Sequence, residues 1–91
     1  MTSETSLPVD RAEIRRRLVS FLGGRLKTTV SPEQDLFEHG LVTSMFAMEL
    51  VVHLEQDFRV SIVGSDLQLQ NFRSVDAMTA LVLRLRSDSE R

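Results

Sequence analysis

The stretch GLVTSMFAMEL, residues 40–50, joins a glycine-containing loop to a segment with helical spacing, and it decides the fold class. Large apolar residues recur every four positions from Phe46 onward, which places them on one face of a helix. The spacing therefore predicts a helix over residues 44–58, about 22 Å long at roughly 1.5 Å per residue. Its expected core residues are Phe46, Leu50, Leu54 and Phe58, with Ala47 and Val51 beside them.

The same predicted helix carries a second apolar strip, Met45, Met48 and Val52, on a different face. Polar and acidic residues border the strip, which is typical of a docking surface. Methionine suits contact with several partners because its side chain is flexible and polarizable. Alternatively, another helix covers the strip, and periodicity alone leaves both interpretations open. The bordering residues are Glu49, Glu55 and Gln56.

Two further long helices are expected, one on each side in the sequence. The first begins near Asp10, which forms a capping pair with Glu13, and ends at Gly23–Gly24. The last follows Ser74 as its N-cap and has Asp76 in its first turn, near the positive end of the helix dipole. The apolar stripes are Ile14, Leu18, Phe21 and Leu22 in the first helix and Val75, Met78, Leu81, Val82 and Leu85 in the last.

A long loop over residues 23–43 separates the first two helices, and Leu36 and Phe37 are expected to tie it to the core. Residues 64–71 have room for one short helix. The predicted fold is therefore all-α: a small helical bundle of three main helices plus one short helix, with a long structured loop between the first and second. We expect one domain over residues 9–86, with disordered ends at residues 1–8 and 87–91.

Composition excludes several classes of function. The 91 residues suit one domain, and 42% hydrophobic residues suffice for a core. Cysteine is absent, which excludes disulfides and thiolate sites, and two histidines cannot hold a metal alone, so no metal site is expected. No apolar run reaches the roughly 20 residues of a membrane span, and the first ten residues do not form a secretion signal. We expect a cytoplasmic monomer that does not contact membranes.

The net charge of −2 is unevenly distributed. Residues 1–31 hold six basic and three acidic residues, residues 32–76 two basic and eight acidic, and residues 77–91 three basic and two acidic. The acidic middle of the chain is expected to attract basic partner surfaces and to repel a nucleic-acid backbone. Nucleic-acid binding is therefore not expected.

Ser44 lies where the predicted helix begins and has three interpretations. It caps the helix, or Thr43 is the cap and Ser44 the first helical residue, or its hydroxyl is an exposed attachment point. A helix N-terminus suits a phosphodiester, because free backbone N–H groups and the dipole favour negative charge. Catalysis is not expected: His39 is the nearby base, but there is no nucleophile elbow, and a small bundle offers no deep pocket.

The stretch DLFEHGLVTSM, residues 35–45, followed by Glu49–Leu50 and by LEQDF at residues 54–58, resembles the acyl and peptidyl carrier proteins. The resemblance covers residues 10–86. It implies a 4′-phosphopantetheine arm on Ser44, added from coenzyme A by a separate phosphopantetheinyl transferase, with an acyl group held on the arm as a thioester. It also implies a docking surface where such carriers meet their enzymes, formed by Thr43, Met45, Met48, Glu49 and Val52.

Thr43 departs from the family pattern, in which an aspartate usually precedes the serine. The transferase often recognises that aspartate. Residues 40–48 and 71–77 are more similar to stand-alone carriers of unusual polyketide extender units, which load a glyceryl unit and mature it to hydroxymalonyl, methoxymalonyl or aminomalonyl forms. That resemblance implies secondary metabolism, such as antibiotic biosynthesis. The implied partners are an acyl- or glyceryl-loading enzyme, tailoring enzymes, and an acyltransferase or ketosynthase.

Two alternatives remain. The stretch GLVTSM is also similar to the D-alanyl carrier of cell-wall teichoic acid, which points to a D-alanyl or aminoacyl carrier. The other alternative is a helical adaptor that is never modified and uses the acidic helix only for docking.

Overall fold

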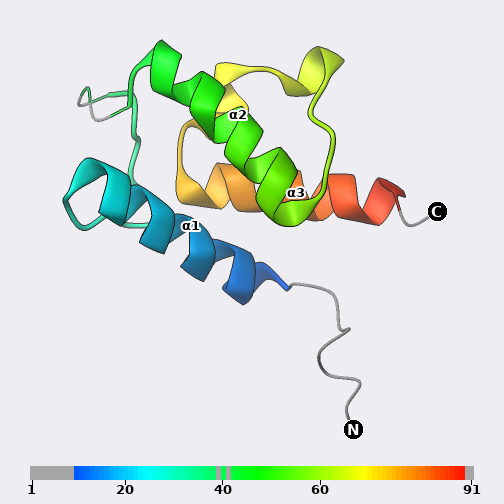
Figure 1. The fold of residues 1–91 in the computed structure, drawn as a ribbon, viewed down its shortest axis with the longest axis horizontal. Coiled ribbons are helices and arrows are strands. Elements are labelled where there is room, and N and C mark those ends of the chain that lie inside the picture. Colours follow the sequence, from blue (N-terminus) through cyan, green and yellow to red (C-terminus); the bar gives the residue numbers. More distant parts are fainter. Residues whose placement is uncertain (1–9, 39, 41, 90–91) are drawn as a thin grey trace, which may run out of the picture.

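The computed structural model describes residues 10–38, 40 and 42–89 and confirms the all-α fold. Figure 1 shows α2 crossing α3, while α1 packs against α3. Two short 3-10 helices replace the one short helix expected over residues 64–71, because the backbone leaves the helical conformation at Leu67 and Gln68. The elements are α1 (Arg11–Leu26), α2 (Ser44–Phe58), η2 (Gly64–Asp66), η3 (Leu69–Phe72) and α3 (Val75–Ser89).

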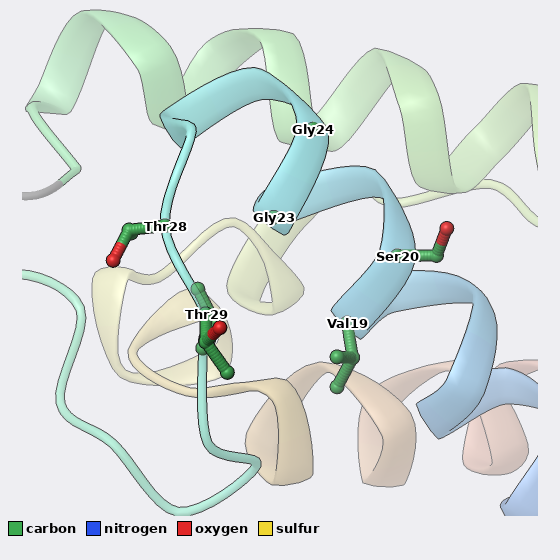
Figure 2. A pocket seen from close by; sticks show the side chains of 7 residues that line it. Val19, Ser20, Gly23, Gly24, Thr28 and Thr29 are labelled. Atoms are coloured by element: carbon green, nitrogen blue, oxygen red, sulfur yellow. The ribbon is translucent and has the colours of Figure 1, made fainter.

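The glycine pair in α1 does not end the helix, so the prediction of an end at Gly23–Gly24 is wrong. Helix α1 continues to Leu26, which packs on the core, and ends where Lys27 adopts a left-handed conformation with φ 58°. Glycine permits a helix end without requiring one, and the buried side of the last turn favours continuation. A Cβ on Gly23 would lie 3.3 Å from the Thr28 carbonyl oxygen, so the glycine lets the departing chain fold back along α1 (Figure 2).

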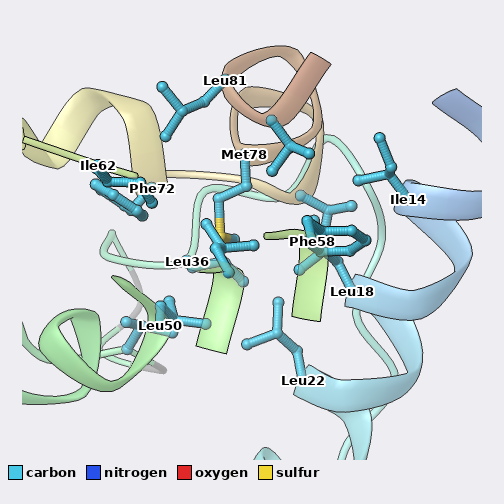
Figure 3. Close-up of a cluster of buried hydrophobic side chains, with 14 of the residues drawn as sticks. Ile14, Leu18, Leu22, Leu36, Leu50, Phe58, Ile62, Phe72, Met78 and Leu81 are labelled. Carbon is cyan, nitrogen blue, oxygen red and sulfur yellow. The ribbon is translucent and has the colours of Figure 1, made fainter. Parts of the chain in front are cut away.

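One apolar core joins the three long helices and the loop (Figure 3). Each predicted stripe contributes, and Val60 and Ile62 pack into the core from the segment after α2, as their alternation suggests. The fully buried side chains of the helices include Ile14, Leu18, Leu22, Leu50, Leu54, Phe58, Val75, Met78 and Val82.

The loop between α1 and α2 is held by backbone hydrogen bonds to the start of α3. The Leu36 N–H donates to the Arg73 carbonyl oxygen at 2.7 Å, and the Asp76 N–H donates to the Pro32 carbonyl oxygen at 3.0 Å. The Leu36 side chain is fully buried, and Phe37 packs at the edge of the core. The prediction that these two residues tie the loop to the core is confirmed.

Charged residues that lie far apart in the sequence form ion pairs in the folded chain. Each pair joins a basic residue of α1 or α3 to a carboxylate from the acidic middle segment, so four of the eight carboxylates of that segment are paired with cations of these two helices. The side chains are partly exposed, so each pair contributes at most about 1 kcal/mol. The pairs are Arg15–Asp76, Arg17–Asp57, Arg25–Glu49 and Arg84–Asp66, with closest N···O distances of 2.8, 3.7, 2.5 and 2.8 Å.

His53 joins α2 to α1 by stacking on Phe21, with ring centroids 3.7 Å apart and an interplanar angle of 7°. Its Nε2 is buried and has no hydrogen-bond partner among the described residues. Burial lowers the pKa of His53 below its usual 6.5, aided by Arg25 and opposed by Asp57. Folding therefore favours the neutral ring. The stability that the neutral ring gives to the folded state is fully present above pH 6.5, and it is lost as the pH falls through the lowered pKa.

The ends of the domain differ in part from the expectation. Helix α3 extends to Ser89, so residues 87–89, expected to be disordered, are helical. Ser74 caps this helix as predicted, because its Oγ accepts a hydrogen bond from the Ala77 N–H at 3.0 Å. The expected disorder of residues 1–8, 90 and 91 falls outside the described residues. Among the helices that the structure describes, none is long and apolar enough to cross a membrane.

Truncation should separate the two faces of α2. Leu50→Ala removes a fully buried side chain and should lower the free energy of unfolding by about 2–5 kcal/mol. Met48→Ala, two residues away on the exposed face, should change it by no more than about 0.5 kcal/mol. Guanidinium chloride unfolding of both variants measures the difference. Equal losses would show that the faces of α2 are assigned wrongly.

Candidate functional site

The N-terminus of α2 presents Ser44 to solvent. Thr43 is the N-cap: it has an extended backbone, and its Oγ1 accepts a hydrogen bond from the Phe46 N–H at 3.1 Å. Ser44 is then the first helical residue and is exposed. Of the two capping interpretations, the structure selects the one in which Thr43 caps, which leaves the Ser44 hydroxyl outside the cap.

The turn before α2 positions this junction. Asp35 Oδ1 accepts hydrogen bonds from the N–H groups of Phe37 and Glu38, each at 3.0 Å, which closes an Asx-type turn. Gly40 then takes φ 74°, a left-handed conformation that favours glycine, and its N–H donates to the Phe37 carbonyl oxygen. The buried Val42 returns the chain to the core immediately before the cap. The loop therefore delivers the chain to Ser44 along a path defined by hydrogen bonds.

The second apolar strip of α2 is exposed, which decides between the two interpretations of the sequence. The exposed fractions are 79% for Met45, 67% for Met48 and 50% for Val52, so none of the helices that the structure describes covers the strip. Phe46, expected in the core, is only partly buried, because it lies at the edge of the core, where the guanidinium of Arg25 stacks over its ring at 4.9 Å.

An apolar groove opens beside Ser44 between α2 and residues 67–72, with a volume of about 360 Å³. Leu67 and Leu69 are about half exposed at its edge. Sequence reasoning missed both as surface residues, although the segment LQLQN alternates apolar and polar residues just before a buried phenylalanine. The groove is lined by Ser44, Ala47, Met48, Val51, Leu67, Gln68, Leu69 and Phe72.

The two carboxylates expected to border the strip, Glu49 and Glu55, have partners within the chain, and so does Asp57 farther along α2. Glu49, expected to contact partner enzymes, is bonded to Arg25, so it does not offer an isolated negative charge. Of the rim carboxylates, Glu49 is thus paired with a cation, whereas Glu55 keeps its charge and is held by a backbone N–H. Glu49 Oε1 accepts from Arg25 Nη2 at 2.5 Å, Glu55 Oε2 accepts from the Ile62 N–H at 2.8 Å, and Asp57 Oδ2 lies 3.7 Å from Arg17 Nη1.

The surroundings of Ser44 suit a phosphodiester better than they suit catalysis. Backbone N–H groups in the first turn of a helix lack intrahelical acceptors and carry a partial positive charge. The first turn of α2 contains no acidic side chain that would repel a phosphate. The described residues contain no cluster of three or more potential metal ligands. His39, considered as a base, lies outside the described residues.

Comparison with known proteins gives one family and one relative. Residues 12–82 match the family described as PP-binding, the phosphopantetheine attachment site. The chain is 37% identical over 70 residues to the "Probable acyl carrier protein PigG" of Serratia sp. (strain ATCC 39006), a match that covers 77% of this chain and 79% of that protein. Both matches include the junction at Thr43 and Ser44 within a carrier-sized domain.

A solved structure has the same fold. The chain is similar to one in the crystal structure of Bradyrhizobium japonicum glycine:[carrier protein] ligase complexed with its cognate carrier protein and an analogue of glycyl adenylate. The TM-score is 0.62 at 28% sequence identity, and the match covers 78% of this chain and 97% of that one. Since part of a 91-residue chain matches nearly all of it, the similar chain is the small carrier protein.

Substitution of Thr43 should reveal its capping role. Thr43→Ala removes the side-chain acceptor of the Phe46 N–H and should lower the free energy of unfolding by about 1 kcal/mol. Thr43→Asp retains an acceptor and places a negative charge at the helix N-terminus, so it should be at least as stable as the native chain. Urea unfolding checks the order. A Thr43→Ala variant as stable as Thr43→Asp would contradict the assignment of the cap.

Proposed function

This chain belongs to the phosphopantetheine-binding carrier protein family, and from that premise we propose that Ser44 carries its 4′-phosphopantetheine arm. Members of the family bear the arm and do not catalyse reactions themselves. The observation that carries the proposal is the position of Ser44: it is exposed, it begins α2, and it borders the apolar groove. When bound, the arm supplies the thiol that holds an acyl group as a thioester.

Ser74 offers an internal comparison, since it is also a serine at the start of a long helix. The Ser74 Oγ already caps α3, where it accepts a hydrogen bond from the Ala77 N–H, and Ser74 is partly buried. In α2 this role falls to Thr43, one position earlier, so the Ser44 hydroxyl is left for other chemistry. The difference between the two helix starts supports Ser44 as the attachment residue.

We place the chain among acyl carriers of polyketide or related secondary-metabolite biosynthesis, with an extender unit as the carried group. The similarity to a probable acyl carrier protein supports an acyl cargo, and the resemblance of residues 40–48 and 71–77 to extender-unit carriers favours this class. The second candidate is an aminoacyl carrier. It is favoured by the similar fold of a carrier that is cognate to a glycine:[carrier protein] ligase.

The partners follow from the proposed cargo. A phosphopantetheinyl transferase modifies Ser44; a loading enzyme, tailoring enzymes, and an acyltransferase or ketosynthase act on the arm. The docking surface proposed for them comprises the residues inferred from the sequence together with the exposed leucines of the groove. These residues are Thr43, Met45, Met48, Glu49, Val52, Leu67 and Leu69.

Mass spectrometry tests the proposed attachment. Incubation with coenzyme A and a broad-specificity phosphopantetheinyl transferase should add one phosphopantetheine to the native chain and none to Ser44→Ala. Ser65→Ala, at an exposed serine of η2, is the matched control and should be modified like the native chain. A modified Ser44→Ala variant would place the site elsewhere, and an unmodified native chain would favour the adaptor alternative.

A further inference from the structure

Arg25, at the C-terminal end of α1, lies beside the exposed strip of α2. Its guanidinium stacks over Phe46 at 4.9 Å and over Phe21 at 5.7 Å, and its Nη2 donates to Glu49. Its side chain is nevertheless about half exposed. Together with Met48, Glu49 and Val52 it lines an open hollow of about 410 Å³. A cation thus borders the strip, where the sequence predicted only acidic and uncharged polar neighbours.

A partner that covers Met48 and Val52 must also remove water from Arg25. A guanidinium has five N–H donors, and one carboxylate such as Glu49 accepts at most two of them in a fork. The contacts with the two aromatic rings are cation–π interactions, which use none of these N–H donors. A donor that loses its water without gaining another acceptor lowers the affinity of the complex, so the partner has to supply an acceptor.

From this arrangement we infer that Arg25 is part of the docking surface, and that the phosphopantetheinyl transferase acting at Ser44 meets it with a carboxylate beside an apolar side chain. The inference rests on the proposed function of Ser44. Arg25 is positioned for this contact because Met48 lines both its hollow and the groove beside Ser44, so a partner that covers Met48 reaches both. A purely basic partner surface would instead meet Arg25 as a like charge.

The competing explanation is that Arg25 and Glu49 only join α1 to α2. A charge swap distinguishes the two explanations. Arg25→Glu combined with Glu49→Arg keeps an ion pair between the helices but exchanges the positions of the positive and negative charges that a partner contacts. The matched control is the swap Arg15→Glu with Asp76→Arg, which exchanges the pair between α1 and α3. Arg25→Gln provides a second variant, which removes the guanidinium without placing a negative charge there.

The experiment measures kcat/KM for transfer of phosphopantetheine from coenzyme A by a broad-specificity transferase, alongside unfolding midpoints. Loss of one charge-assisted contact should slow modification about tenfold in the Arg25 swap and in Arg25→Gln. The Arg15 swap should be modified at the native rate. A native rate for both Arg25 variants, or faster modification of either one, would overturn the inference.

Failure of this inference is distinguishable from failure of the proposed function. If Ser44 is not the attachment residue, Ser44→Ala is still modified or the native chain is not, and both proposals fall. If only Arg25 is misassigned, the native chain is modified, Ser44→Ala is not, and the two charge swaps behave alike.

Discussion

Leu36 is the residue on which the arrangement around Ser44 depends. Its side chain is fully buried, its N–H donates to the Arg73 carbonyl oxygen at 2.7 Å, and its carbonyl oxygen accepts from the Val42 N–H at 3.0 Å. One residue thus joins the long loop to the start of α3 and to the start of α2. Because its burial and both bonds are lost together if the loop detaches, the loop is a structural part of the domain.

The pairing of charges between helices determines the character of the surface near Ser44. A chain with a strongly acidic middle segment folds so that α2 carboxylates are bonded to α1 arginines or to backbone. What remains exposed beside Ser44 is an apolar surface with the Arg25–Glu49 ion pair at its edge. Recognition by partners should therefore depend on apolar contact and on a few oriented hydrogen bonds more than on long-range attraction.

Sequence periodicity was sufficient for the helices and for most of the core. The α2 bounds, the caps at Asp10 and Ser74 and the plug at Leu36 all follow from local patterns with strong physical causes. The end of α1 could not be obtained in this way, because packing of Leu26 outweighs the weak helix preference of two glycines.

The surface was less predictable than the core. The exposed strip of α2 was visible in the sequence, but whether another helix covers it depends on the path of the chain after α2. The pairing of Glu49 with Arg25 joins residues 24 positions apart, and no local pattern encodes it. The groove beside Ser44 arises for the same reason, since residues 67–72 reach α2 only through the tertiary fold.

Amide hydrogen exchange of Leu36 and Val42, followed by NMR, tests most directly the claim that an anchored loop holds Ser44 in place. Both N–H groups donate to carbonyl oxygens in the structure, so both should be protected to a degree that approaches the core of α3 at Met78. Exchange of Leu36 and Val42 at the rate of an unstructured peptide, with Met78 still protected, would contradict the account.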